Sequence, residues 1–412
     1  MSSASADRAS VAIVGGGVLG CSIAWHLARK GVTDVLVLER NDLGSGATSR
    51  SAGLVSRGRL HAPAMAMVRR TREAIAELES ILGEDVGFRR VGSVRVARSA
   101  NGADDLVNMD RMLADYGIDL RNIDEAEAHE RVPWLDATGA TRISYVEDDG
   151  YVDAYRLTTA YARAARARGV RFRVRTGVHA ILRSGDRATG VATDAGPVHA
   201  DAVVNAGGAW AISLADGAGF SMATAPVRSH YYITAPQADL PPDHPVVYLP
   251  DARAYARPEV GGLLIGVQEP MSRTYDARTL PPDIADFPLS DASDEWTVLS
   301  EHAATLRAYI PRLDTLPLAH HISGLSTYTP DGRFLIGRGG TLEGFYIAGG
   351  CCGTGVSASG GIGAAVAALV MREPTEFDLG DFAPDRFGAV DPYGAAFRER
   401  CAAARASKLR LG

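Results

Sequence analysis

The order of apolar and polar positions near the N-terminus predicts a strand, a helix and a second strand. Residues 11–14 are four consecutive apolar residues, which is typical of a short buried strand. Apolar residues then recur at helical spacing, as at Ile23 and Leu27, until Gly31 ends the pattern. A second apolar run follows at residues 35–38. We therefore expect a compact βαβ unit at the start of the chain.

The same periodicities predict the elements of the rest of the chain. Further helices are expected at residues 63–82, 106–116, 155–168, 294–310 and from the loop 349–355 to residue 371. Further strands are expected at residues 92–97, 171–178, 203–210, 227–234, 255–258, 262–267 and 345–348. On the helix at 294–310, an apolar face is expected from Trp296, Leu299, Leu306 and Ile310. Three arginines alternate along the strand at 171–178 and are expected to form a solvated face.

Three glycines at the start of the first helix indicate what the βαβ unit binds. Gly15, Gly17 and Gly20 have the G-x-G-x-x-G spacing, which allows a tight turn, the approach of a pyrophosphate and close packing of helix on strand. The phosphates are then expected at the N-terminus of the helix, where the backbone dipole favours negative charge. Glu39 ends the second strand, where a carboxylate can accept both ribose hydroxyls. The unit is therefore predicted to bind a dinucleotide.

Composition narrows the class of protein. The chain has 412 residues, 46% of them hydrophobic, which is enough for two domains with large cores. A formal net charge of -6 argues against a nucleic-acid partner, since such proteins usually carry a basic face. The four cysteines lack a metal-binding or disulfide spacing, and the first ten residues lack a secretory pattern. Residues 345–371 are uncharged but too rich in glycine and serine for a membrane span. We expect a cytoplasmic protein without a metal site.

Two further glycine-rich stretches support the dinucleotide assignment and extend it. Residues 44–54 form a loop rich in glycine, serine and threonine, with many N–H and hydroxyl donors. Near the other end of the chain, residues 324–334 and 344–360 contain the segments GLSTYTPDGRF and GFYIAGGCCGTGVSASG. With the N-terminal unit and residues 203–210, these segments resemble the D-amino acid oxidase superfamily, closest to its sarcosine/dimethylglycine dehydrogenase and glycine oxidase group.

The resemblance implies an α/β fold in two domains and FAD as the cofactor. A Rossmann-like FAD-binding domain with a GR2-type βαβ unit is expected from residues 1–85, 150–222 and 326–412. A second, α+β substrate domain built on an antiparallel sheet is expected from residues 86–149 and 223–325. The residues expected to bind FAD are Gly15, Gly17, Val18, Leu19, Gly20, Glu39, Arg40, Ser45, Thr48, Ser49, Arg50, Ser51, Ala52, Gly53, Leu54, Val178, Ala206, Gly207, Trp210, Gly350, Gly353, Thr354, Gly355 and Val356.

The resemblance also implies that the FAD is noncovalent. Relatives that attach the flavin use a histidine at the position of Arg50 or a cysteine near the position of Gly324, and this chain has neither. Cys351 and Cys352 lie in the loop expected beside the flavin, and we interpret them as small packing residues. The helix that follows this loop is expected to direct its positive end toward the pyrimidine side of the flavin.

The expected chemistry is transfer of a hydride from the C–H next to an amine nitrogen to flavin N5, which gives an imine that hydrolyses. Substrates in this class are secondary amines, N-methyl amines and amino acids. Substrate contacts are expected from the sheet that covers the flavin, at Tyr255, Arg228, His230, Arg257 and Tyr328. An arginine would suit a substrate carboxylate because its planar fork makes two parallel hydrogen bonds.

Two departures from the resembled group leave alternatives open. Ser326 stands where relatives that oxidise D-amino acids have a carboxylate-binding arginine, which argues against a simple α-amino acid. The lysines, Lys30 and Lys408, are not placed to activate oxygen, so the acceptor is either oxygen or an electron-transfer partner. A 2-hydroxy-acid dehydrogenase and a non-catalytic regulatory partner with a flavin fold remain alternative functions.

Overall fold

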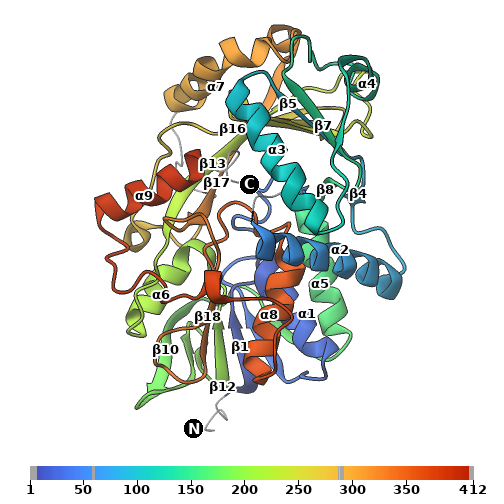
Figure 1. Cartoon of the computed structure of the whole chain (residues 1–412). Coiled ribbons are helices and arrows are strands. Elements are labelled where there is room, and N and C mark those ends of the chain that lie inside the picture. Colours follow the sequence, from blue (N-terminus) through green and yellow to red (C-terminus); the bar gives the residue numbers. More distant parts are fainter. Residues whose placement is uncertain (1–6, 58–60, 286, 288–291, 408–412) are drawn as a thin grey trace.

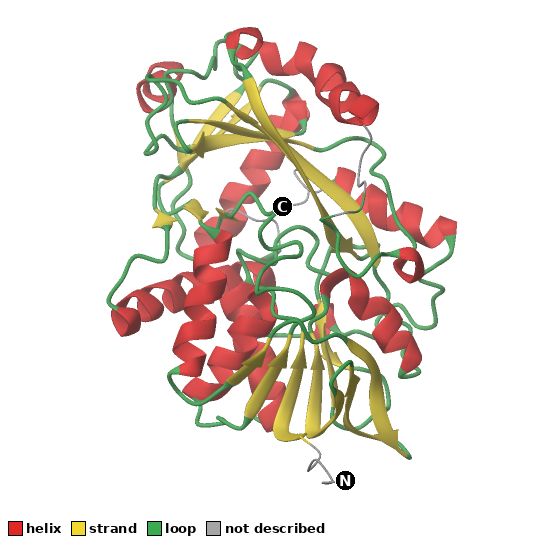
Figure 2. Ribbon diagram, turned by 180° about the vertical axis from the view of Figure 1, so that it is seen from behind, coloured by secondary structure: helices red, strands yellow, loops and turns green. Residues whose placement is uncertain are grey.

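The protein is built around two large β-sheets that face each other across the middle of the molecule (Figures 1 and 2). The computed structural model describes residues 7–57, 61–285, 287 and 292–407. The start of β1 lies at the end of the first sheet that is far from the second sheet, and the loops at the other end of the first sheet are directed toward the second sheet (Figure 2). The space between the sheets therefore receives the loops that follow the parallel strands.

The first sheet contains the predicted βαβ unit. Its path runs β10-β11-β12-β1-β2-β9, with β19 also paired to β12 and β18 paired to β19. Strand β1 pairs in parallel with both β2 and β12. The strands are β1 (Asp7–Val14), β2 (Val35–Leu38), β9 (Arg171–Arg173), β10 (Val178–Ser184), β11 (Arg187–Thr193), β12 (Gly196–Asn205), β18 (Leu335–Arg338) and β19 (Phe345–Gly349).

Four helices cover one face of this sheet and bury the largest apolar cluster. They are α1 (Val18–Arg29), α2 (Ala62–Leu82), α5 (Ala154–Arg166) and α8 (Ser359–Met371). Glycines in α8 allow close helix packing, since a Cβ on Gly361 would overlap Met67 of α2 and a Cβ on Gly363 would overlap Ser22 of α1. The short helix α6 (Ala211–Gly217) belongs to a separate apolar cluster with strands of the same sheet.

The second sheet has the strand order β17-β13-β16-β15-β14-β5-β7-β6. All its pairs are antiparallel except β14 with β5. The strands are β5 (Ser93–Ala97), β6 (Arg121–Asn122), β7 (Arg142–Val146), β13 (Ala225–Thr234), β14 (Val246–Leu249), β15 (Ala254–Glu259), β16 (Gly262–Val267) and β17 (Leu318–Tyr328). The helices of this half are α3 (Ala100–Asp115), α4 (Glu125–Arg131) and α7 (Ala292–Arg307), while α9 (Ala395–Ala406) packs against β13 and β17.

Shorter elements connect these layers. A small three-stranded sheet is formed by β3 (Leu54–Val55), β8 (Gly150–Val152) and β4 (Phe88–Arg89). Short 3-10 helices lie at η1 (Gly208–Trp210), η2 (Pro250–Ala252), η3 (Ala277–Thr279), η4 (Leu313–Thr315) and η5 (Gly380–Phe382). The strands of the second sheet come from both chain segments expected to form the substrate domain, but the domain boundaries themselves stay a prediction.

The structure departs from the sequence-based expectations at four places. The strand expected at 203–210 ends at Asn205, and Gly208–Trp210 form the 3-10 helix η1 instead. The strand expected at 171–178 is split into β9 and β10, because Arg175 adopts a positive φ of 54° that interrupts the extended backbone. On α7, Trp296 is 52% exposed, so it does not share the buried face of Leu306. Helix α8 begins at Ser359, after a series of turns that follows the glycine-rich loop. Lys408 lies outside the described residues.

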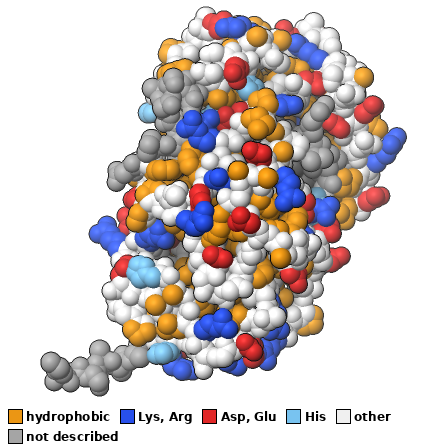
Figure 3. Space-filling view, turned by 90° about the vertical axis from the view of Figure 1, so that its left-hand side faces the viewer, with side chains coloured by type: hydrophobic (Ala, Val, Ile, Leu, Met, Phe, Trp, Pro, Cys, Tyr) orange, Lys and Arg blue, Asp and Glu red, His pale blue; other side chains and the backbone are white. Residues whose placement is uncertain are grey.

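The surface shows no segregation of charge on the face seen in Figure 3, where acidic and basic side chains are interspersed with hydrophobic ones. None of the four cysteines forms a disulfide. In the described part of the chain, no helix has both the length and the apolar character needed to cross a bilayer.

Candidate functional site

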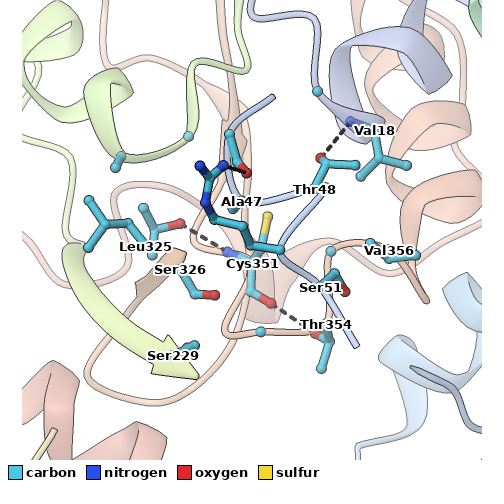
Figure 4. A pocket seen from close by; sticks show the side chains of 18 of the residues that line it. Val18, Ala47, Thr48, Ser51, Ser229, Leu325, Ser326, Cys351, Thr354 and Val356 are labelled. Carbon is cyan, nitrogen blue, oxygen red and sulfur yellow. Dashed lines mark hydrogen bonds between the residues drawn. The ribbon is translucent and has the colours of Figure 1, made fainter. Parts of the chain in front are cut away.

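A cavity of about 320 Å³ lies between the two sheets and is lined by residues from both. At one end, its wall comes from β1, the start of α1 and the loop after β2. Figure 4 shows Val18 and Thr48 on this side, Ser229 and Ser326 on the opposite side, and Cys351 between them. Segments that are far apart in the sequence therefore share one cavity.

The three glycines of the first motif have different structural roles. Gly15 has a φ of 104°, and a Cβ there would overlap the carbonyl oxygen of Ala206 on the neighbouring strand. A Cβ on Gly20 would overlap the Gly15 carbonyl oxygen, so Gly20 allows the helix to pack on its own strand. A Cβ on Gly17 would have Thr48 Oγ1 as its nearest neighbour, at 3.3 Å. Gly17 lines the cavity, so its missing side chain leaves space there.

The N-terminus of α1 is directed at this end of the cavity. The Val18 N–H donates to Thr48 Oγ1 at 3.1 Å (Figure 4), and the N-cap residue Gly17 supplies no capping side chain. The first turn of α1 has no acidic residue. A helix N-terminus carries about half a positive charge and favours an anion.

Glu39 lies beside the glycine motif, as the spacing predicted. Its carboxylate accepts hydrogen bonds from the Gly16 N–H at 2.6 Å and the Asn41 N–H at 2.9 Å, and the side chain lines the cavity. These bonds orient the carboxylate while each oxygen keeps acceptor capacity for a hydroxyl. The space at Gly17, the helix N-terminus and this carboxylate together fit the pyrophosphate and ribose of a dinucleotide.

An arginine and an indole bound this end of the cavity. The Arg40 guanidinium lies 5.0 Å from the centre of the Trp210 ring, and Trp210 Nε1 donates to the carbonyl oxygen of Pro281 at 2.9 Å. Both side chains line the cavity. Sequence reasoning placed Arg40 and Trp210 at the cofactor but gave no sign that they contact each other.

The loop at residues 44–54 runs along the cavity. Arg50 donates to the backbone carbonyl oxygens of Ser45 and Gly46, so its side chain holds the loop in its curved form. A Cβ on Gly324 would lie 2.9 Å from the Arg50 Cβ. Arg50 and Gly324, at the two positions where the resemblance implies a covalent tether, are therefore adjacent in space, and neither residue is a histidine or cysteine.

The opposite wall comes from the segment after β19. The Thr354 hydroxyl donates to the Cys351 carbonyl oxygen at 2.9 Å, and the Cys351 N–H donates to Thr327 Oγ1 at 3.4 Å (Figure 4). Burial raises the pKa of the Cys351 thiol to about 12, so the thiol is neutral at neutral pH. The N–H of Gly360, in the first turn of α8, donates to Thr71 Oγ1 at 2.9 Å. The predicted effect of this helix on the flavin stays a prediction.

Most of the residues predicted to bind FAD line the cavity. Gly20, Ser49 and Gly350 do not: Gly20 packs on Gly15, Ser49 is exposed, and a Cβ on Gly350 would meet Thr329 and Leu335. The other predicted cofactor residues are Gly15, Gly17, Val18, Leu19, Glu39, Arg40, Ser45, Thr48, Arg50, Ser51, Ala52, Gly53, Leu54, Val178, Ala206, Gly207, Trp210, Gly353, Thr354, Gly355 and Val356, and all are in its wall. Their contacts with the cofactor stay predictions.

The five predicted substrate residues fall into two groups. Tyr255, His230 and Tyr328 line the cavity. Arg228 and Arg257 do not. Arg228 is buried and its Nη2 lies 2.7 Å from Glu269 Oε2.

Arg257 connects the second sheet to the loop at residues 44–54. Its Nε donates to the Ala52 carbonyl oxygen at 2.7 Å, and its guanidinium forms an ion pair with Glu259. The guanidinium also lies 4.4 Å from the centre of the Tyr151 ring. These contacts hold β15 against the loop at 44–54, which makes Arg257 a structural link at the edge of the cavity.

Tyr255, Tyr328 and His230, which line this half of the cavity, are neutral near neutral pH. Burial raises the pKa of Tyr328 to about 12 and raises the pKa of Tyr255 further. Burial lowers the pKa of His230 to about 2, and the positive charges of Arg405 and Arg228 lower it as well. The tyrosine hydroxyls can therefore donate hydrogen bonds to a ligand.

Sequence reasoning missed several residues of the substrate half. Gln268, Tyr248 and Arg95 line the cavity from the second sheet, and Arg405 reaches it from α9. Of these residues only Arg95 lies in a strand that the sequence predicted, and a tail helix with several arginines gave no signal that singled out Arg405. Over the described ranges, no three His, Cys, Asp or Glu side chains are arranged to hold a metal ion.

Comparisons with known proteins agree with this geometry. A profile of the family described as "DAO: FAD dependent oxidoreductase" matches residues 10–369. The chain is 32% identical over 381 residues to 4-methylaminobutanoate oxidase (formaldehyde-forming) of Paenarthrobacter nicotinovorans, which covers 91% of this chain and 45% of that protein. It is 30% identical over 387 residues to glycine oxidase of Geobacillus kaustophilus (strain HTA426), covering 92% and 97% of the two chains. The chain therefore spans less than half the length of the first relative and nearly all of the second.

A solved structure confirms the fold class. L-proline dehydrogenase from P. horikoshii superimposes with a TM-score of 0.82 at 25% identity, covering 93% of this chain and 98% of the other. The predicted Rossmann-like domain with a second, sheet-based domain is thus the shared architecture.

Proposed function

This chain belongs to the DAO family of FAD-dependent oxidoreductases, and we propose that it oxidises an amine at the carbon next to nitrogen. The substrate class is a secondary amine, an N-methyl amine or an amino acid. Bound FAD supplies the hydride acceptor, its N5 atom, and the resulting imine hydrolyses. The observation that carries the proposal is a single cavity that joins a dinucleotide cradle at Gly17 to a wall containing Tyr255 and the buried Tyr328.

The side chains of this chain have three tasks in the reaction. The cradle at Gly15 and Gly17 positions the cofactor, with Glu39 for the ribose and the α1 N-terminus for the phosphates. The neutral hydroxyls of Tyr255 and Tyr328 orient the substrate by hydrogen bonds. Burial of this wall excludes water from the reacting carbon, which strengthens each polar contact.

The relatives support the proposed bond. The names of 4-methylaminobutanoate oxidase and glycine oxidase both denote enzymes that act on compounds with a carbon–nitrogen bond. The cofactor is proposed to be noncovalent because Arg50 and Gly324 occupy the tether positions. We further propose that oxygen or an electron-transfer partner reoxidises the flavin, and that the protein works in the cytoplasm, which four cysteines without a disulfide support.

Anaerobic reduction tests the proposal. The FAD-loaded protein is mixed with a series of N-methyl amines, amino acids and 2-hydroxy acids, and the visible flavin band is followed. Bleaching by amines with release of an aldehyde or keto acid is expected. Bleaching by 2-hydroxy acids alone would replace the proposal with the hydroxy-acid alternative. A purified protein that takes up no FAD would favour a regulatory partner without turnover.

A further inference from the structure

Helix α9 contributes one buried arginine to the cavity. The helix packs beside β13 and β17 (Figure 1). Arg405 is 3% exposed and is part of the cavity wall, whereas Arg400 on the same helix is exposed. The side chain of Arg405 thus passes inward between the helix and the sheet.

Arg405 donates its short hydrogen bonds to neutral oxygen atoms. Its Nη1 donates to Ser272 Oγ at 2.7 Å, its Nε to Ser229 Oγ at 3.3 Å and its Nη2 to the Val267 carbonyl oxygen at 3.3 Å. Glu269 Oε1 lies 3.9 Å from Arg405 Nη1, while the other oxygen of the same carboxylate is 2.7 Å from Arg228. The nearby carboxylate is therefore engaged more closely by a different arginine.

Arg95, a second buried arginine in the cavity wall, differs from Arg405 in having a close carboxylate partner. Arg95 Nη2 lies 3.0 Å from Asp149 Oδ2, and the same guanidinium donates to Ser93 and Ser56. Arg95 is matched by a close counter-ion, and a ligand would add little to it. A buried guanidinium held mainly by neutral groups is costly, and a ligand carboxylate would reduce that cost.

We propose that Arg405 binds a carboxylate on the substrate, so that the enzyme selects amines that also carry an anionic group. The inference rests on the proposed amine oxidation and specifies its substrate. The guanidinium fork can hold both oxygens of a carboxylate. Ser229, Tyr255 and Tyr328 line the same cavity, and the charge of Arg405 acts on both tyrosines. The role that the sequence suggested for Arg228 on β13 is taken by a residue of the C-terminal helix.

A binding experiment separates this role from a structural one. The FAD-loaded protein is titrated with propanoate and with its uncharged analogue propanamide, and binding is read from the flavin spectrum. The unmodified protein binds propanoate more tightly. Arg405→Gln weakens propanoate binding by about tenfold to a hundredfold and leaves propanamide binding unchanged, because a hydrogen-bonded charge is lost. Arg400→Gln, on the exposed face of the same helix, changes neither affinity.

Three results would overturn the proposal. The unmodified protein could bind propanoate and propanamide with equal affinity, or Arg405→Gln could bind propanoate as tightly as the unmodified protein does. The third result is that Arg405→Gln loses the same factor of affinity for both compounds. If Arg405→Gln does not retain FAD, Arg405→Lys is used to test whether Arg405 binds the carboxylate. Lysine keeps the charge but not the fork, so propanoate binding falls by a smaller factor than that expected for Arg405→Gln and propanamide binding is unchanged. An unaltered ratio of the two affinities in Arg405→Lys would contradict the assignment.

Turnover distinguishes failure of this inference from failure of the proposed function. N-methyl-β-alanine and N-methylethylamine differ by the carboxylate, and the unmodified enzyme is expected to prefer the former. Arg405→Gln removes the preference and still bleaches with N-methylethylamine. If no amine bleaches the flavin while propanoate binding still depends on Arg405, amine oxidation is refuted and the role of Arg405 is not. Bleaching with no preference in the unmodified enzyme would refute the role of Arg405 alone.

Discussion

Replacing Gly17 with valine is expected to remove FAD while leaving the fold intact. Gly17 is the N-cap of α1 with a φ of -73°, which valine adopts without strain. The added Cβ would have Thr48 Oγ1 as its nearest neighbour at 3.3 Å, and the rest of the side chain would extend into the cavity. The substitution thus fills the space of the ligand and leaves the packing of helix on strand unchanged.

The two effects differ in size. Valine is a poorer N-cap than glycine, which costs about 1 kcal/mol of stability and lowers Tm by about 2 °C. Loss of two backbone hydrogen bonds to the charged pyrophosphate costs about 3–6 kcal/mol, or a rise in Kd of about 100-fold to 10,000-fold. Loss of cofactor therefore exceeds loss of stability by a wide margin.

The assay compares FAD content with folding. Gly17→Val is purified, its absorbance ratio of flavin to protein is measured, and FAD is titrated back while circular dichroism and Tm are followed. Gly217→Val is the matched control, since Gly217 ends α6 at an exposed position with open space around its Cβ. Gly20→Ala gives the opposite pattern, with loss of fold, because its Cβ would overlap the Gly15 carbonyl oxygen. Yellow Gly17→Val protein with ordinary FAD affinity would refute the reasoning.

Three further outcomes follow from the same structure. Arg228→Met is expected to lower the free energy of unfolding by about 3 kcal/mol, because Glu269 stays buried without its partner at 2.7 Å. Adding Glu269→Gln to this variant should recover part of the lost stability in urea titrations. Equal stability of the unmodified protein, the single variant and the double variant would contradict this. Burial lowers the pKa of His26 from 6.5 to about 3, so the folded protein should lose about 1.4 kcal/mol per pH unit as the pH falls from 6.5 toward 3. His26→Gln should flatten that slope in unfolding titrations, and an unchanged slope would count against the burial argument. Acid precipitation should release all FAD into the supernatant, since Arg50 forms no flavin bond; a yellow pellet would reveal a covalent link.

The N-terminal unit could be predicted because its residues interact with near neighbours in the sequence. Gly20 is a glycine because a Cβ there would overlap the carbonyl oxygen of Gly15, five residues earlier, and Glu39 follows from the length of one helix and one strand. Four strands of the second sheet, β5, β13, β15 and β16, were also expected from local sequence patterns, whereas β6, β7, β14 and β17 were not. Their pairing partners come from distant segments, so the strand order could not be read from alternation.

The substrate half shows where sequence reasoning ends. Period-two alternation placed Arg228 and His230 on one face of β13, but it contains no information about which face meets the cavity. Glu269 pairs with Arg228 from 41 residues away, and this contact removes the arginine from the cavity wall. Arg405 enters through docking of a helix on a distant sheet. Such contacts depend on tertiary packing, which no local pattern encodes.

The walls of the cavity come from residues as distant in the chain as Gly15 and Gly355. During translation, the segment around Gly15 leaves the ribosome long before the segment around Gly355 has been synthesised. A growing chain therefore cannot retain flavin until most of the chain has been made. Because a ligand stabilises only the folded state it binds, the free FAD concentration at that moment determines how many chains fold around it. Cells short of riboflavin should therefore accumulate less of this protein at an unchanged rate of synthesis.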